Sequence, residues 1–155
     1  MKWDFTRRFG FLVNDVAKLY GEQFDRLARE RIGLSRAQCR LLGVLAAHGD
    51  DQPLSQVELA HRMDLTPMAV GGLCDRMAAA GWIRRQPSAH DRRANEVSLE
   101  PSARKALGVA VKLGDNLSDR ALSVLSSQER EQLHSMLARV RIHLLAGAPA
   151  GEENA

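Results

Sequence analysis

The chain has 155 residues, 45% of them hydrophobic, which is enough for one ordinary domain with a core, or for one domain and an assembly element. Its 22 Lys and Arg residues against 19 Asp and Glu give a net charge of +3, which is compatible with nucleic-acid binding without requiring it. The longest apolar run, Leu41 to Ala47, is too short to cross a bilayer, and residues 1–16 lack signal-peptide features. We therefore expect a cytoplasmic protein without a membrane segment.

The first predicted element is a long amphipathic helix from Trp3 to about Ile32. Its apolar residues recur with helical spacing at Phe5, Phe9, Leu12, Val16, Leu19 and Leu27. This stripe must be buried against another surface. No part of the pattern says which surface that is.

Two capping boxes predict the next two helices. Ser35 and Gln38 have the spacing of a capping box and start a second helix that closes at Gly49. Ser55 and Glu58 have the same spacing and start a third, short helix. Its apolar residues are Val57, Leu59, Ala60 and Met63.

A fourth helix follows closely, with Thr66 as its N-cap and Pro67 in its first turn, where the missing N–H costs nothing. Its inward residues are predicted to be Val70, Leu73, Cys74 and Met77, and Gly81 ends it as a C′ glycine. Two short helices separated by only a few residues are typical of a helix-turn-helix.

A basic hairpin is predicted next, with strands at Trp82–Gln86 and Asn95–Leu99. Four arginines stand within ten residues, at positions 84, 85, 92 and 93, and Asp91 is the only acidic residue among them. The positive charge is thus concentrated on the hairpin.

Two helices are predicted after Pro101, the second beginning at a third capping box formed by Ser126 and Glu129. One stripe of the last helix contains Leu133, Met136, Leu137, Val140 and Leu144. The small, polar residues 147–155 are expected to form a disordered tail. Apolar stripes at both ends of the chain have too little compact middle to cover them, so a second copy is the expected cover.

This order of elements resembles the MarR family of winged helix-turn-helix transcription regulators, in particular its SlyA-like branch. The resemblance covers about Phe5 to Leu145 and is most specific in "LSQVELAHRMDLTPMAVGGLCDRMAAAGWIRRQPSAHDRRANEVSLE". A departure is that Leu99 is followed by Glu100 and then Ser102-Ala103, where the family has Thr and then Gly.

The resemblance implies a mainly α fold with a small β-hairpin wing. Residues 1–32 would form an N-terminal dimerisation helix, 33–100 the winged DNA-binding domain and 101–146 the C-terminal dimerisation helices. It also implies a homodimer on a pseudo-palindromic duplex DNA site, with recognition helices about 34 to 36 Å apart. Such regulators often respond to small aromatic acids or oxidants.

The candidate DNA contacts lie on the helix-turn-helix and the hairpin. Arg92 or Arg93 is expected to enter the minor groove, with Asp91 pairing to Arg76 or to the other arginine. Ser55 and Gln56 are candidates for phosphate contact, and Thr66 and Met68 for base contact, the latter through thymine methyls. The remaining candidates are Gly71, Gly72, Arg84, Arg85 and His90, and only one of Arg84 and Arg85 can face DNA because they alternate across their strand. Gly71 and Gly72 indicate either close approach of the backbone to DNA or simple tolerance of glycine.

The effector pocket that the resemblance implies would lie between the dimerisation helices and the winged domain. Trp3, Phe9, Arg40 and His48 could stack on an aromatic ring or hold a carboxylate, although each is more often a core or surface residue. No cofactor is expected.

Redox, metal and catalytic chemistry have little support. Cys39 and Cys74 are expected to be reduced, structural thiols. The histidines show no spacing typical of metal ligands, and no catalytic motif is present, so an enzyme is not expected.

Three functions remain open. The preferred one is a ligand-responsive repressor, and the second is an architectural or anti-silencing DNA-binding factor without a ligand switch. The third is a protein-interaction module whose hairpin binds an acidic partner.

Overall fold

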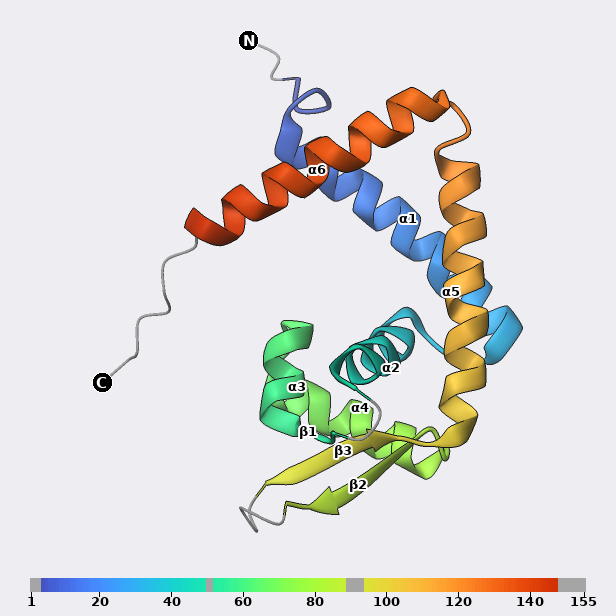
Figure 1. Cartoon of the computed structure of the whole chain (residues 1–155), viewed down its shortest axis with the longest axis vertical. Helices are drawn as coiled ribbons and strands as arrows, with labels where there is room; N and C mark the ends of the chain where they lie inside the picture. The colour runs from blue at the N-terminus through green and yellow to red at the C-terminus, as the bar shows by residue number, and fades with distance from the viewer. Residues whose placement is uncertain (1–3, 50–51, 89–93, 148–155) are drawn as a thin grey trace. The chain divides into compact units, whose positions relative to one another are not determined.

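The structure is a computed structural model that describes residues 4–49, 52–88 and 94–147 (Figure 1). In these residues the chain forms six α-helices and a three-stranded antiparallel sheet, which confirms the predicted mainly α fold with a hairpin wing. The elements are α1 (Phe9–Ile32), α2 (Arg36–His48), β1 (Leu54–Ser55), α3 (Gln56–Met63), α4 (Pro67–Ala79), β2 (Ile83–Pro87), β3 (Asn95–Leu99), α5 (Pro101–Ala121) and α6 (Ser127–Gly147).

The chain divides into two compact units, Met1–Leu117 and Ser118–Ala155. The first contains α1 to α4, the sheet and most of α5, and the second contains the end of α5 and α6. The division lies inside α5 because the first part of this helix packs on the core. Its side chains at positions 103, 106 and 110 are alanines with at most 6% exposure, and such small residues let the helix approach closely.

The core of the first unit is built by the helices that precede the wing. Leucines, methionines, two valines and a cysteine account for the largest fully buried side chains, which are Leu34, Leu41, Leu42, Leu59, Met63, Val70, Cys74, Met77, Val97 and Leu117. All four residues predicted to face inward from α4 are buried. The hydrophobic pattern therefore predicted the buried face of α4 correctly.

Helix starts follow the predicted caps with one exception. The backbone N–H of Gln38 donates to Ser35 Oγ at 3.2 Å and Gln38 Oε1 accepts from Ser35 N–H at 2.7 Å, which confirms that capping box. Ser126 and Glu129 form another. At α3 only half of the predicted box is present, because the Glu58 carboxylate accepts from Arg62 Nε at 3.0 Å and not from the backbone of its N-cap Ser55.

The sheet has the strand order β1-β3-β2, so β3 lies in the middle. Val97 of β3 pairs with Leu54 on one side and with Arg85 on the other. The hairpin was predicted to begin at Trp82, but β2 begins one residue later because Trp82 belongs to the turn that ends α4. There Gly81 has φ +76°, its N–H donates to the carbonyl of Ala78, and the N–H of Trp82 donates to Met77, as in a Schellman motif.

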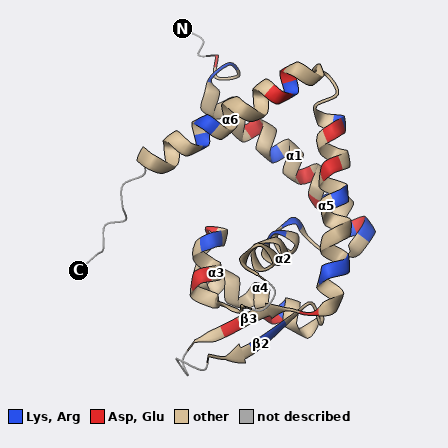
Figure 2. Cartoon of the chain, in the orientation of Figure 1, with Lys and Arg blue, Asp and Glu red and all other residues tan. Residues whose placement is uncertain are grey.

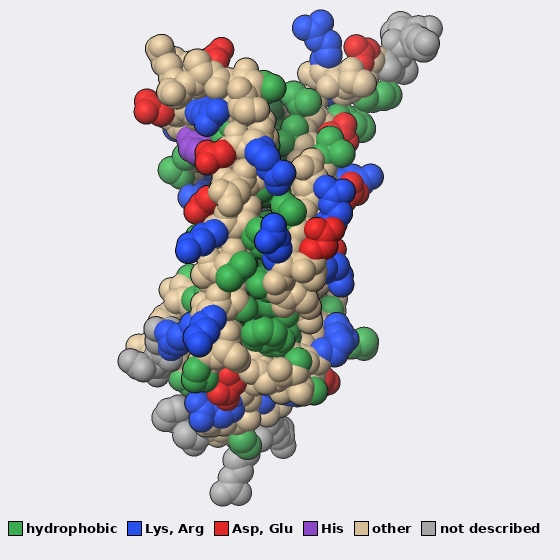
Figure 3. Space-filling model, turned by 90° about the vertical axis from the view of Figure 1, so that its right-hand side faces the viewer, with side chains coloured by type: hydrophobic (Ala, Val, Ile, Leu, Met, Phe, Trp, Pro, Cys, Tyr) green, Lys and Arg blue, Asp and Glu red, His purple; other side chains and the backbone are tan. Residues whose placement is uncertain are grey.

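The terminal helices differ from the prediction in extent, and their apolar stripes are not covered within this chain. Helix α1 starts at Phe9 and not at Trp3, and α6 extends through Gly147, which was assigned to the tail; residues 148–155 lie outside the described residues. The predicted apolar stripes are largely exposed within this chain, from 53% to 60% at Phe9, Leu12, Val16 and Leu19 of α1. Hydrophobic side chains lie at the surface among charged ones on the face drawn in Figure 3. Among the described helices, none combines the length and the apolar character that a membrane span requires.

Candidate nucleic-acid interface

The helix-turn-helix consists of α3 and α4, joined by a tight turn at Asp64 to Thr66. Asp64 adopts a left-handed conformation with φ 53°, which an acidic residue tolerates better than most. The hydroxyl of Thr66 then accepts from the N–H of Ala69 at 3.2 Å, and Pro67 occupies the first turn, as predicted. The sharp stop of α3 and the immediate start of α4 fix the angle between the two helices.

The outward face of α4 is exposed and poor in groups that read bases. Met68 is 88% exposed, and Thr66 and Arg76 are also exposed. A Cβ placed on Gly71 would lie 3.8 Å from Gln56 Nε2, and one on Gly72 would lie 3.5 Å from Arg76 Nη1, both ordinary contacts. Packing within the chain therefore does not require glycine at either position.

A short network closes the wing hairpin next to its tip. The N–H of Ser88 donates to the carbonyl of Ala94 at 2.8 Å, and the Ser88 hydroxyl donates to Glu96 Oε1 at 2.7 Å. The predicted tip residues His90, Asp91, Arg92 and Arg93 lie outside the described residues, as does the expected pair between Asp91 and Arg76. The placement of the tip residues stays a prediction.

The two arginines of β2 have different surroundings, as their alternation along the strand predicts. Figure 2 marks the basic residues of the strand in blue. Arg84 is exposed, with its Nε 3.5 Å from Glu100 Oε1. Arg85 turns toward the helices, where its guanidinium donates to Asp75 of α4 and to Gln56 of α3. Two of the predicted DNA contacts, Gln56 and Arg85, are thus brought together with a carboxylate that the sequence reasoning had not linked to either of them.

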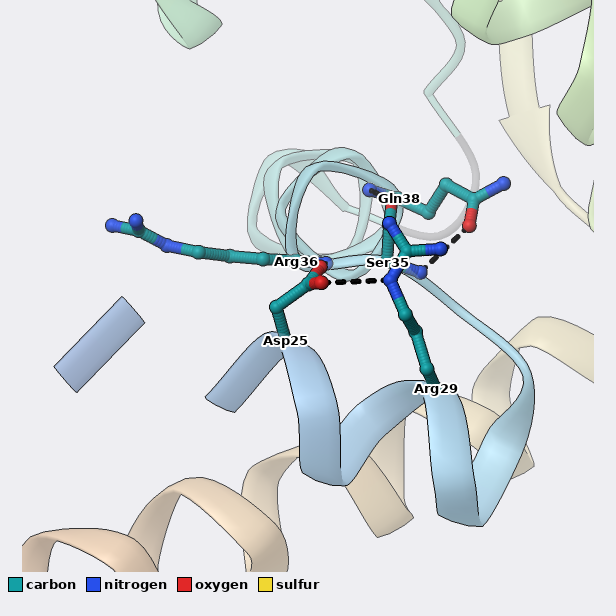
Figure 4. Close-up of polar contacts among 5 residues, drawn as sticks. All are labelled: Asp25, Arg29, Ser35, Arg36 and Gln38. Carbon is teal, nitrogen blue, oxygen red and sulfur yellow. Dashed lines mark hydrogen bonds and ion pairs between the residues drawn. The ribbon is translucent and has the colours of Figure 1, made fainter. Parts of the chain in front are cut away.

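Helix α1 is attached to the start of α2 by Asp25 (Figure 4). Its carboxylate accepts from Arg29 Nε at 2.7 Å and from the backbone N–H of Arg36, in the first turn of α2, also at 2.7 Å. The hydrogen bond from Arg29 and then the one from the backbone of Arg36 lower the pKa of Asp25. Asp25 accepts from the N–H of Arg36 and Ser35 accepts from the N–H of Gln38. Two backbone donors at the beginning of α2 are thereby satisfied.

A cavity of about 350 Å³ opens between α1, α2 and α5, within the first unit. It is lined by Tyr20, Phe24, Arg36, Cys39, Arg40, Leu107, Ala110 and Val111. Of the four predicted effector residues only Arg40 is in this lining. His48 lies elsewhere, with its Nδ1 3.1 Å from Arg62 Nη1, Phe9 lies 60% exposed on the first turn of α1, and Trp3 is outside the described residues.

Sequence reasoning missed the aromatic part of this lining. Tyr20 and Phe24 are four residues apart, so they share one face of α1, and the Tyr20 hydroxyl donates to the carbonyl of Gly114 in α5 at 3.1 Å. That spacing, in a chain with a single tyrosine, was the available signal. The partner on α5 follows only from the tertiary fold.

Both cysteines are buried and free. Burial, and secondarily the negative charge of Asp25, raises the pKa of Cys39 to about 11, and burial also raises the pKa of Cys74. Raised thiol pKa values favour the protonated, unreactive form at neutral pH. Among the described residues there is no cluster of three or more His, Cys, Asp or Glu side chains that could hold a metal ion.

The comparison with family models gives one match that bears on this geometry. Residues 32–94 match the MarR family. The matched segment spans α2, the helix-turn-helix and the start of the wing. The transcriptional regulator HosA of Escherichia coli is 25% identical over 127 residues, covering 82% of this chain and 92% of HosA. Both likenesses are to transcription regulators and not to enzymes.

Solved structures give the same fold. The crystal structure of a probable transcriptional regulator from Pseudomonas aeruginosa is 27% identical, with a TM-score of 0.75 over 88% of this chain and 99% of that one. The crystal structure of the S. aureus MepR–DNA complex has a TM-score of 0.73 at 24% identity, covering 87% of this chain and 97% of that one.

Proposed function

We propose that this chain is a MarR-family winged helix-turn-helix transcription regulator, which binds duplex DNA as a homodimer and represses transcription in the cytoplasm. The proposed site on DNA is pseudo-palindromic, because a two-fold dimer presents two equivalent recognition helices. A small aromatic or phenolic acid is proposed to release the DNA. The observation that carries the proposal is the pair α3 and α4, which exposes the outer face of α4 beside a basic hairpin.

The proposed dimer interface uses α1 and α6. Helix α6 has no buried residue among those described, and Met136, Leu137 and Leu144 are exposed by 53%, 45% and 63%. Contiguous apolar area of this kind on a water-exposed helix marks an association surface. A second copy of the chain offers the same faces, so an isologous contact can cover both.

The proposed DNA contacts divide by groove. Thr66, Met68, Gly71, Gly72 and Arg76 would face the major groove from α4, and Ser55 would contact phosphate at the start of α3. The chain's own packing leaves room for a Cβ at both glycines, so the fold does not require glycine there. We propose close approach of the backbone of α4 to DNA, and simple tolerance of glycine is the alternative. The wing would place Arg92 or Arg93, with Arg84 and His90 nearby, against the minor groove.

The charge of the wing tip can be tested directly. Replacing both residues, Arg92→Ala with Arg93→Ala, is expected to weaken operator binding by about tenfold or more and to flatten its salt dependence, since fewer counterions are released. Binding titrations at several salt concentrations measure both quantities. An unchanged affinity and an unchanged slope would contradict the role of the wing.

The effector is proposed to bind in the cavity between α1, α2 and α5. Its volume of about 350 Å³ suits a single-ring ligand, and it combines an aromatic wall with the guanidinium groups of Arg36 and Arg40. A benzoate-like anion fits this chemistry, because the ring can pack on Tyr20 and Phe24 while an arginine holds the carboxylate. Arg40→Gln is expected to weaken salicylate binding about tenfold, whereas His48→Gln is the matched control outside the lining and should leave it unchanged.

The first experiment for the whole proposal is selection of genomic fragments by the purified protein at about 0.15 M salt, with and without salicylate. Recovery of a few palindromic sites that are lost with salicylate supports a ligand-gated repressor. Absence of any DNA recovery would refute the proposed function.

A second candidate, an architectural factor without a ligand switch, is favoured by one observation. The outer face of α4 offers few hydrogen-bonding groups for bases, with Met68 and two glycines at its centre. Recovery of broad AT-rich fragments that is indifferent to salicylate would support this candidate instead.

A further inference from the structure

The strand β2 contains two adjacent arginines with opposite surroundings. The side chain of Arg84 is 58% exposed and faces Glu100, whereas that of Arg85 is 27% exposed and faces the helix-turn-helix. Adjacent residues of one strand point to opposite faces, so the strand itself explains the difference in direction. The alternation of the strand does not explain why Arg85 donates hydrogen bonds to two different residues.

The guanidinium of Arg85 joins three elements. Its Nη1 donates to Asp75 Oδ1 on α4, and its Nη2 donates to Gln56 Oε1 on α3. Its Nε is buried and has no hydrogen-bond partner among the described residues, so its orientation is determined by the two terminal nitrogens. A planar guanidinium can hold two acceptors at a fixed spacing, which a lysine ammonium cannot do in the same way.

Main-chain pairing in the sheet links the hairpin to α3 a second time. Arg85 is paired with Val97 in the sheet, Val97 is also paired with Leu54, and Leu54 directly precedes the N-cap of α3. The helix-turn-helix is therefore linked to the hairpin by main-chain bonds on one side and by the Arg85 side chain on the other. Two links at different places resist rotation of the hairpin against the helices, which a single link does not.

The exposed position of Asp75 helps to distinguish a structural role of Arg85 from a role in binding DNA. Its side chain is 66% exposed on the outer part of α4, where a negative charge opposes the approach of phosphates. Pairing with Arg85 neutralises this charge and uses it to hold the strand. A cation already bonded to a carboxylate and an amide is also a poor ligand for a further anion.

We propose that Arg85 is a positioning residue, which together with Asp75 and Gln56 fixes the angle between the wing and the recognition helix and does not itself bind DNA. This inference rests on the proposed DNA-binding function. It reassigns Gln56, which was predicted to contact phosphate, and Arg85, which was a candidate DNA contact, to the support of other contacts. The wing arginines act on DNA, and Arg85 determines where they lie.

The sign of the effect of Asp75→Asn tests this proposal. If Arg85 is a DNA ligand held back by Asp75, the variant frees a cation, removes a negative charge and binds DNA more tightly. If Arg85 is a positioning residue, the variant weakens binding about tenfold although the protein has become more positive. Asp115→Asn, which removes the same charge from an exposed position on α5, is the matched control and should leave the affinity unchanged.

A second comparison uses the two arginines of β2. Arg85→Gln is expected to weaken operator binding about tenfold in the native protein, and to have an effect of less than about twofold when Arg92 and Arg93 are already alanine. A direct contact would instead give the same loss in both backgrounds. Arg84→Gln is the control within the same strand, and its effect should be the same in both backgrounds.

Footprinting separates positioning from mere stability. Hydroxyl-radical protection in the minor groove at the flanks of the operator should be lost in Asp75→Asn and in Gln56→Ala, while protection in the major groove by α4 remains. Circular dichroism at the temperature of the binding assay verifies that each variant is folded. Tighter binding by Asp75→Asn, or intact flanking protection, overturns the positioning role alone, whereas absence of DNA binding by the native protein overturns the proposed function and this inference with it.

Discussion

The interior of the first compact unit, Met1–Leu117, which we call the winged unit, and the surface of α6 have similar hydrophobic patterns. Their side chains are buried in the first and exposed in the second. Leu41 and Leu59 are 0% exposed in the winged unit, whereas Leu144 and Leu145 of α6 are 63% and 70% exposed. All four belong to helical stretches with apolar residues in regular positions. The comparison teaches that a hydrophobic stripe identifies a face to be buried but does not identify the molecule that buries it.

The largest expected effect comes from removing a side chain that this chain covers by itself. Leu41→Ala should lower the free energy of unfolding by about 3 kcal/mol, because it removes buried methyl groups and leaves a cavity. The loss should be the same at all protein concentrations. Leu144→Ala is the counterpart on α6, and its effect on the midpoint of urea unfolding should grow with protein concentration, because we propose that a second copy of the chain covers this side chain. An effect of Leu144→Ala that is independent of protein concentration would contradict the proposal that a second copy covers this side chain.

The next effect concerns assembly. Leu137→Asp with Leu144→Asp places two charges on one face of α6, seven residues apart. The pair should convert the proposed dimer to monomer and weaken operator binding about 100-fold through loss of bivalency. Sedimentation equilibrium and DNA titration measure the two losses. Val124→Asp, at an 86% exposed position in the turn between α5 and α6, is the control. A monomeric variant with full affinity would contradict the dimeric mode of binding.

A smaller effect is expected at Asp25, where α1 meets the winged part. Asp25→Asn should destabilise the protein by about 1 kcal/mol at pH 7, mostly through the bond to the backbone of Arg36, because solvent weakens the ion pair with Arg29. The folded protein holds the pKa of Asp25 below its ordinary value, so its contribution is present above about pH 4 and is lost as the pH falls further. Urea unfolding from pH 7 to pH 3 should show the variant and the native protein converging. A difference that persists at pH 3 would disagree with this account.

The smallest effect is expected from oxidants. Because burial raises the pKa of Cys39 to about 11 and raises that of Cys74 as well, both thiols stay protonated near neutral pH. Peroxide at pH 7.5 should leave DNA affinity unchanged, and a disulfide reagent should label the folded protein at least about 100 times more slowly than the urea-unfolded chain. Rapid labelling of folded protein would show that the interior of the winged unit opens more readily than its burial indicates.

Most helix boundaries of this fold were predicted well because each depends on residues close together in the sequence. Ser35 with Gln38, Ser126 with Glu129, Pro67 after Thr66, and Gly81 each act over at most four residues, and the structure contains all of these features. Failures occurred where a partner lies far along the chain. Strand β1 has two residues and therefore no alternation to detect, and its pairing with β3 spans about forty positions.

The site was predictable by type of residue but not by partner. The sequence placed Arg84 and Arg85 on opposite sides of one strand, which is correct, yet it could not show that Gln56 would accept a hydrogen bond from a residue 29 positions away. In the same way Arg40 was selected for its charge, whereas Tyr20 and Phe24 were not, because their value depends on α5 lying across them. Side-chain partners follow from tertiary packing, which periodicity does not encode.

The paired glycines of α4 have a consequence for how the specificity of this protein can diverge. Neither Gly71 nor Gly72 is needed by the fold, since the nearest atoms leave room for a side chain, and each glycine lowers helix stability by about 1 kcal/mol relative to alanine. If α4 faces the major groove as we propose, substitutions at these two positions would alter which DNA sequences are bound while the helix gains stability. The proposed recognition surface could then acquire new operator preferences, by evolution or by selection from a library, without a stabilising change elsewhere.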